Sequence, residues 1–138
     1  MSEHCVVCEI ALGRAEASIV YDDDQVVAFM DLRPITTGHL LVVPRKHAES
    51  LADLDADDGA QMFRVAQRLA AAIRASEVRS DGVNLFLADG EAAGQEVFHV
   101  HLHVLPRYPA DGFKLQITRA EPSRAELDDL AARLRQAG

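Results

Sequence analysis

Three histidines alternate with aliphatic residues in the segment His99-Val100-His101-Leu102-His103-Val104-Leu105. Side chains of a strand point alternately to its two faces. A strand over 97–105 therefore places the three imidazoles on one face and the aliphatic side chains on the other. Because an imidazole titrates near pH 6.5, one ring can be a neutral nucleophile while a neighbour acts as a charged acid or phosphate clamp. The pattern favours a catalytic cluster with His101 as its nucleophile.

Two other interpretations of the histidine row stay open. Alternate residues of a strand are about 6.6 Å apart, so His99 and His103 are separated by roughly 13 Å, too far to share one zinc ion with ligand bonds of about 2.0 Å. A single metal held by the whole row is thus disfavoured. The other interpretation is that the three histidines have no function, but each ring then needs a polar partner if it is buried.

A loop with two glycines, residues 89–96, precedes this strand. Backbone N–H groups around Gly90 and Gly94 are candidates for a phosphate cradle. A turn between two strands also requires glycine, so the loop alone is weak evidence.

Cys5 and Cys8 form a lone Cys-x-x-Cys pair. A chain without signs of export is not expected to depend on disulfides, and the strand-helix-strand pattern of a redox pair is missing. Half of a zinc site and two ordinary thiols remain the alternatives.

The composition of 138 residues, 49% hydrophobic, suits a single globular domain over 1–138. A formal charge of −8 disfavours binding to nucleic acid, which needs a basic surface. We find no segment apolar enough for a signal peptide or a membrane span, and therefore expect a cytoplasmic protein that is not attached to membranes.

The elements expected from periodicity are mostly strands. Apolar runs 19–21 and 26–30 predict a hairpin, and 40–43 and 83–87 predict further strands. A main helix is expected over 55–77, with Phe63, Ala66, Ala70 and Ile73 on its apolar face. A final helix begins at Ser123, which forms a capping box with Glu126 and precedes the apolar positions Leu127, Leu130 and Leu134. Antiparallel strands with helices packed on one face give an α+β class.

The run from Gly94 to Arg107 resembles the signature of the histidine triad (HIT) superfamily of nucleotide hydrolases and transferases. Segments 5–10, 28–34 and 38–47 are similar to its compact bacterial members. The resemblance implies an antiparallel sheet of about five strands with a main helix and a C-terminal helix. It also implies a homodimer whose sheets join edge to edge, and an active site for the α-phosphate of a purine nucleotide.

The resemblance assigns roles to individual residues. His101 would attack phosphorus to form a nucleotidyl-histidine, which water then hydrolyses to a nucleoside monophosphate. His103 would contact phosphate oxygens or the leaving group, a carbonyl near His99 would orient His101, and His39 matches a supporting fourth histidine. The expected substrate-binding residues are Asp31 for the ribose, Leu32 near the base, Glu96 near the leaving group, and Gln95 and Asp89. The alternatives are purely structural: Asp31 ends a strand, and Leu32 lies in the core.

The same resemblance predicts a zinc site. Two N-terminal cysteines, a histidine after the third strand and the first triad histidine correspond to Cys5, Cys8, His47 and His99. Two sulfurs and two imidazoles form a closed tetrahedral structural site. His4 is expected to be a solvated neighbour.

Two departures from the family pattern bear on the substrate. Glu96 stands where many relatives have serine or threonine, and Ala88 and Asp89 stand where many have asparagine. A carboxylate repels an anionic leaving group and favours a cationic amine. Glu96 turned outward into solvent is the alternative. The short single-domain form resembles the branch of the family that cleaves nucleoside phosphoramidates, and Glu96 adds slightly to this expectation, with a dinucleoside polyphosphate hydrolase and a nucleotide-binding regulatory module of little turnover as the alternatives.

Overall fold

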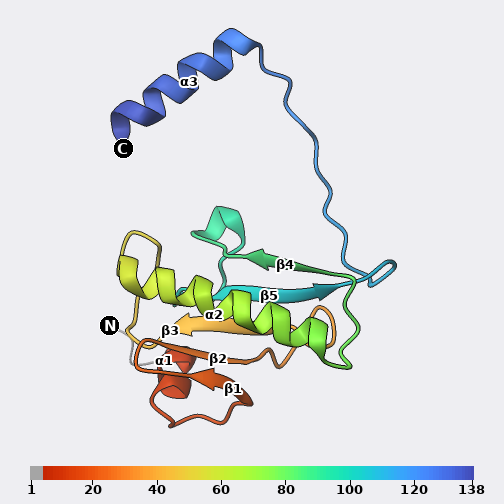
Figure 1. Ribbon diagram of the computed structural model, residues 1–138. Helices are drawn as coiled ribbons and strands as arrows, with labels where there is room; N and C mark the ends of the chain where they lie inside the picture. The colour runs from red at the N-terminus through yellow and green to blue at the C-terminus, as the bar shows by residue number, and fades with distance from the viewer. Residues whose placement is uncertain (1–4) are drawn as a thin grey trace.

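The computed structural model describes residues 5–138, and His4 lies outside them. A five-stranded antiparallel sheet forms the body (Figure 1), with strand order β1-β2-β3-β5-β4. The elements are α1 (Val6–Ala11), β1 (Ile19–Asp22), β2 (Val26–Met30), β3 (Leu40–Pro44), α2 (Ala56–Ala75), β4 (Gly82–Phe86), the 3-10 turn η1 (Glu91–Ala93), β5 (Leu102–Arg107) and α3 (Arg124–Ala137). The α+β class and the number of strands agree with the prediction.

The predicted strand over 97–105 is wrong in its bounds, because β5 begins only at Leu102. Leu102 is the first residue of this segment to pair with β3, opposite Val42, and the segment before it is irregular. One consequence is that His99 is not part of the regular strand on which the alternation of the three histidines was based.

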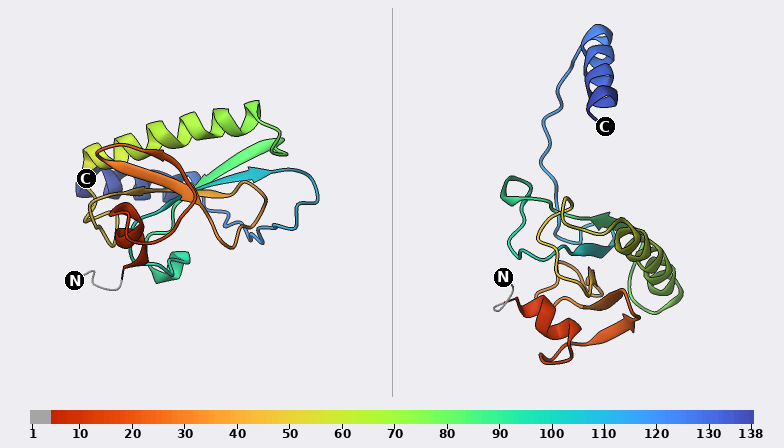
Figure 2. Two further views of the ribbon diagram at one scale, coloured as in Figure 1. Left: turned by 90° about the horizontal axis from the view of Figure 1, so that it is seen from below. Right: turned by 90° about the vertical axis from the view of Figure 1, so that its left-hand side faces the viewer.

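Helices cover both faces of the sheet, whereas the sequence indicated one (Figure 2). Val26, Ala28, Leu40, Val42 and Val104 pack with α2 in the main core. Their neighbours in the strands, Val27, Phe29 and Val43, pack with Val7 and Ala11 of α1 in a second core. The alternation of side chains along β2 and β3 thus supplies both cores.

Helix α2 begins after Asp55, whose carboxylate accepts a hydrogen bond from the N–H of Asp57. Its buried residues are Met62, Val65, Ala66, Leu69 and Ile73, whereas Phe63 is 56% exposed. The buried face of α2 is therefore rotated by part of a turn from the predicted one, since Phe63 points away from the sheet. No helix in the described part of the chain is both long enough and apolar enough to cross a lipid bilayer.

The capping box predicted at Ser123 and Glu126 is present at the start of α3. This helix does not pack on the body: an extended segment carries it away from the end of β5, beyond the edge strand β4 (Figure 1, Figure 2). All residues of the arm 114–138 except Ala132, which is half-buried, are exposed.

Candidate active site and metal centre

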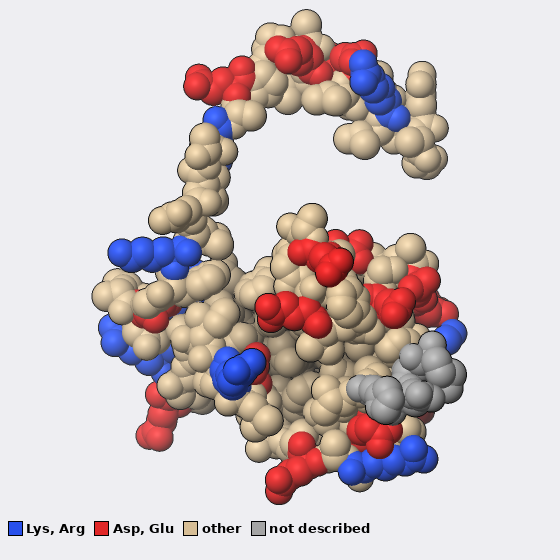
Figure 3. Space-filling model, turned by 180° about the vertical axis from the view of Figure 1, so that it is seen from behind, with Lys and Arg blue, Asp and Glu red and all other residues tan. Residues whose placement is uncertain are grey.

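A cleft of about 560 Å³ lies on the face of the sheet that carries α1. Figure 3 views the molecule from this side, and the hollow on this face is bordered by acidic side chains. The polar residues that line the cleft are Asp31, Arg33, Glu16, Glu96, His101 and His103. Its volume is in the range of sites for small molecules.

His101 has a defined tautomer. Its Nδ1 lies 2.8 Å from the backbone carbonyl oxygen of His99. A carbonyl only accepts hydrogen bonds, so Nδ1 carries the proton and Nε2 keeps its lone pair. The ring lines the cleft, half-buried. This is the arrangement required of a neutral imidazole nucleophile.

His103 and His39 are joined by a hydrogen bond of 2.9 Å between Nδ1 of His103 and Nε2 of His39. Nδ1 of His39 accepts the N–H of Ile35 at 3.1 Å, so the proton of neutral His39 is on Nε2 and is donated to His103. Neutral His103 then carries its own proton on Nε2. The pair thus fixes His103 as a hydrogen-bond donor at that atom.

Burial, together with charge repulsion from the rings of His101 and His39, lowers the pKa of His103 to about 4, against the opposing effect of Asp31. Burial also lowers the pKa of His39, against the opposing effect of Asp31. Both rings are therefore neutral at pH 7 in the free protein. The sequence interpretation, in which a neighbour of the nucleophile is protonated, does not hold for His103 before a ligand binds.

Phe86 was not predicted as a site residue, yet its ring stacks on His103 with centroids 4.1 Å apart and planes 15° apart. The two residues are opposite each other in the pairing of β4 with β5. Such a pair cannot be identified until strand pairing is known. Phe86 covers one face of the imidazole and limits its rotation.

Asp31, Leu32 and Glu96 all line the cleft. One carboxylate oxygen of Asp31 accepts the N–H of Arg33, and the other lies 3.6 Å from Nε2 of His39. Leu32 is 92% exposed, so the alternative that it is a core residue is excluded. Its side chain forms a rim available to a ligand.

Gln95 and Asp89 do not line the cleft. Gln95 is buried, and its amide accepts the N–H of Gly90 and donates to the carbonyls of Glu49 and Val97. Asp89 accepts the N–H of Leu51. Both side chains hold the loop before the histidines in place.

The N–H groups of Gly90 and Gly94 are also occupied within this loop. Gly90 donates to Gln95, as above, and Gly94 donates to the carbonyl of Glu91. Neither of these two N–H groups is therefore open to a phosphate, and the positive φ angles of both glycines, +97°, serve the turn.

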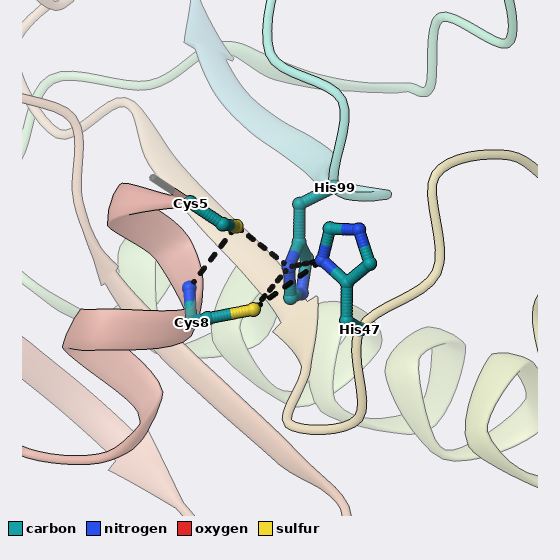
Figure 4. A group of neighbouring side chains, drawn as sticks. All are labelled: Cys5, Cys8, His47 and His99. Atoms are coloured by element: carbon teal, nitrogen blue, oxygen red, sulfur yellow. Dashed lines mark hydrogen bonds between the residues drawn. The ribbon is translucent and has the colours of Figure 1, made fainter. Parts of the chain in front are cut away.

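A second polar cluster lies beside the cleft, where Cys5, Cys8, His47 and His99 converge from α1, the segment after β3 and the segment before β5 (Figure 4). Nδ1 of His99 lies 3.3 Å from Sγ of Cys5, 3.5 Å from Sγ of Cys8 and 3.2 Å from Nδ1 of His47. Nδ1 of His47 is 3.3 Å from Sγ of Cys8. The sequence placed these four residues together only by resemblance, and they do converge.

The donor set fits zinc. Ligand bonds of about 2.0 Å to nitrogen and 2.3 Å to sulfur in a tetrahedron give ligand–ligand distances of about 3.3–3.8 Å, close to those above. Nε2 of His99 donates to the carbonyl of Pro44 at 2.8 Å, which leaves the lone pair on Nδ1 for a metal. The four side chains can therefore hold a zinc ion without rearrangement.

His99 differs from the prediction in its orientation. The period-two pattern placed its ring beside those of His101 and His103, but it is fully buried and turned toward the cysteines. Of these three histidines, His101 and His103 have their rings in the cleft, with centroids 5.0 Å apart. His99 contributes its carbonyl to the cleft side and its imidazole to the metal cluster.

Comparisons with known proteins identify a family and structures of similar fold. Residues 13–110 match the model of the family described as HIT domain. The protein called hit of Bacillus subtilis is 40% identical over 113 residues, covering 81% of this chain and 77% of its own. A crystal structure of a HIT family protein from Bacillus anthracis superposes with a TM-score of 0.92 at 34% identity, over 99% of this chain and 98% of its own. A Zn-bound histidine triad family protein from Mycobacterium smegmatis is 40% identical, with a TM-score of 0.78 over all of both chains.

The match to the Bacillus anthracis structure includes the C-terminal arm. Residues 1–113, which precede the arm, are 113 of 138, so superposing them alone would yield a TM-score of at most about 0.82. The observed value of 0.92 requires that more than half of the arm superposes as well. The extended course of the arm is thus shared with a crystallised protein.

Proposed function

Since this chain belongs to the histidine triad family, we propose that it hydrolyses or transfers nucleotides, acting on the α-phosphate of purine nucleoside phosphoramidates. The observation that supports this most directly is the hydrogen bond from Nδ1 of His101 to the carbonyl of His99. It leaves a lone pair on the ring atom farthest from the backbone, in a cleft of nucleotide size.

The first step uses that lone pair. Nε2 of His101 forms a bond to phosphorus while the bond from phosphorus to the amine nitrogen breaks. The amine takes a proton from solvent as it leaves, and the positive charge that develops on the imidazole is stabilised by the His99 carbonyl at Nδ1–H. Water then attacks phosphorus and gives one proton to solvent, which releases the nucleoside monophosphate and restores neutral His101.

His103 donates from Nε2–H to a phosphate oxygen or the leaving group. Its neutral state suits this role, because a donor without charge needs no counter-ion in the free site. His39 holds the tautomer of His103, and Asp31 lies behind His39. Asp31 also presents carboxylate lone pairs to the ribose hydroxyls, and Leu32 contacts the base.

Glu96 favours an amine leaving group over a nucleotide. It lines the cleft together with His101, so its negative charge opposes the departure of an anion and attracts a cation. Hydrolysis of a dinucleoside polyphosphate is the competing reaction, and this carboxylate makes it the less favoured one.

Cys5, Cys8, His47 and His99 hold a structural zinc ion in this proposal. With four protein ligands the ion has no open position for substrate, and it would hold α1 to the segment before β5.

Two copies pair through the open edge of β4, which makes the protein a homodimer.

A substrate panel tests the proposal. Purified protein is incubated with adenosine 5′-phosphoramidate, guanosine 5′-phosphoramidate and diadenosine tetraphosphate, and monophosphate release is followed by chromatography. The phosphoramidates are expected to react fastest, and His101→Ala is expected to bind AMP but release none. Turnover by His101→Ala at the wild-type rate would refute the nucleophile, and AMP binding without any turnover by the wild type would favour the regulatory module.

A further inference from the structure

The floor of the cleft is a row of residues that runs across the sheet. Four of its lining residues are opposite one another in successive strands: Phe86 in β4, His103 in β5, Leu41 in β3 and Phe29 in β2 (Figure 1). The row continues to Ile19, the first residue of β1. Neighbouring strands are about 4.8 Å apart, so His103 and Phe29 are roughly 10 Å apart along this floor. The cleft therefore has a histidine end and an apolar end.

The apolar end can hold the flat faces of a base. Phe29 and Leu41 form its floor, and Ile10 of α1 lines it as well. With the α-phosphate at His101 and the ribose at Asp31, the base of a nucleotide lies at this end. Apolar side chains contact the faces of a base, whereas hydrogen bonds to its edge distinguish one base from another. The polar groups at the apolar end therefore decide which base is bound.

A carboxylate lies at this end. Glu16 is in the segment between α1 and β1, and it lines the cleft beside Ala17. The carbonyl of Ser18 accepts the N–H of Met30, so this segment runs along the end of β2, next to Asp31. Glu16 is exposed, and its carboxylate makes no hydrogen bond or ion pair with any other residue of the range 5–138. Its two oxygens are therefore open to a ligand.

The charges of the cleft favour a ligand edge that donates hydrogen bonds. Carboxylates of Glu16, Asp31 and Glu96 line it, whereas Arg33 is the only lysine or arginine among its described lining residues. Figure 3 shows acidic side chains at the border of the hollow. A carboxylate accepts hydrogen bonds and donates none. Guanine presents two adjacent donors, N1–H and the N2 amino group, at its Watson–Crick edge, but adenine presents one amino group beside the lone pair of N1.

We propose that Glu16 recognises the base and makes this protein prefer guanine nucleotides over adenine nucleotides. Its two oxygens accept N1–H and N2–H of guanine in a bidentate, charge-assisted contact. With adenine, one oxygen faces the lone pair of N1 and is left unpaired, which a site built for N–H donors disfavours. Because Glu16 is exposed, we expect a preference of about tenfold, near the low end for bidentate contacts to a base.

This inference rests on the proposed function, because it places the phosphate at His101. The two ideas fail differently. Equal binding of guanine and adenine nucleotides contradicts the role of Glu16 alone, whereas a protein that binds neither contradicts both.

Calorimetric titration of the full-length protein with GMP, IMP and AMP tests the preference. The wild type should bind GMP about tenfold more tightly than AMP, with IMP between them because it has N1–H but no N2 amino group. In Glu16→Gln the amide oxygen can accept N6–H and the amide nitrogen can donate to N1 of adenine, so the ratio of dissociation constants should fall below two or invert. AMP binding as tight as GMP binding in the wild type would overturn the proposal.

A matched control separates this contact from a change in net charge. Glu9→Gln removes a carboxylate of α1 that does not line the cleft, and it should keep the wild-type ratio within twofold. The ratio of kcat/KM for guanosine and adenosine 5′-phosphoramidate should follow the ratio of binding constants in all three proteins, with circular dichroism to confirm that each is folded. A shift as large in Glu9→Gln as in Glu16→Gln, or none in either, would contradict the assignment of Glu16.

Discussion

His99 and His101 are linked by a 2.8 Å hydrogen bond from the imidazole of His101 to the backbone carbonyl of His99, whose own ring lies among two cysteines and His47. One residue thus belongs to both clusters. The backbone position that orients the candidate nucleophile depends on the residues of the candidate metal centre.

Loss of the metal cluster is therefore expected to affect both stability and rate. Cys8→Ser should bind less than 0.1 zinc per chain, where the wild type binds about one, and should melt several degrees lower. It should also release AMP at least tenfold more slowly, because loss of a residue that positions a site from outside it typically lowers activity by about 10–100-fold. Metal content by mass spectrometry, thermal melting and AMP release are the measurements. A zinc-free variant with wild-type melting and rate would show that the cluster holds no metal of consequence.

The stability of the protein should depend on the protonation of His103. Its pKa is about 4 when folded and near 6.5 in an ordinary unfolded chain, so between these values the unfolded chain binds more protons. The contribution of His103 to the free energy of unfolding is therefore present in full above pH 6.5 and is lost as the pH falls toward 4. Urea denaturation from pH 7 to 4.5 should give a smaller decrease for His103→Gln, whose amide still accepts the hydrogen bond of His39. Identical pH profiles would contradict the assigned shift.

Glu96 should set the preference between leaving groups. Glu96→Gln is expected to raise the rate with diadenosine tetraphosphate relative to adenosine phosphoramidate by about fivefold, since two unit charges at about 4 Å in water interact with about 1 kcal/mol. Glu91→Gln is the matched control, because Glu91 is in the same loop but does not line the cleft. A ratio that is the same in both variants would remove Glu96 from the specificity argument.

Gly38 places His39 and should tolerate no side chain. It has φ +97°, and a Cβ there would lie 2.7 Å from Cγ1 of Val78 and 3.2 Å from Cγ of Pro106. Gly38→Ala is expected to lower the free energy of unfolding by about 1–3 kcal/mol more than Gly13→Ala, where φ is +75° and nothing lies within 4 Å of the added carbon. Equal losses in chemical denaturation would mean that the backbone angle alone matters.

The sequence predicts elements well where the signal is local. The hairpin 19–30, the cap at Ser123 and the start of α2 at Asp55 follow from neighbouring residues, and all are present. Phe63 was misassigned because helical periodicity allows more than one apolar face, and the position of the sheet selects among them. The two faces of the sheet and the detached arm are properties of the tertiary structure.

The candidate site residues also divide into those that a local sequence pattern predicts and those that depend on tertiary structure. Alternation along 101–104 correctly places His101 and His103 on one face, because His101 directly precedes the strand that begins at Leu102, but it fails at His99, three residues before that strand. The bond of His39 to His103 spans 64 positions, and the stacking of Phe86 depends on the pairing of β4 with β5. Neither leaves a local signal. Gln95 and Asp89 were expected beside the substrate on the strength of their place in the motif, and only the structure shows their contacts with the backbone.

The most direct test of the central claim is detection of the covalent intermediate. Wild-type protein mixed with adenosine 5′-phosphoramidate is quenched within milliseconds to seconds and measured by intact-mass spectrometry, followed by peptide mapping. A fraction of the protein should gain the mass of one adenylyl group on His101, and His101→Ala should gain none. Turnover with no adduct at any quench time, or an adduct on another residue, would contradict the account.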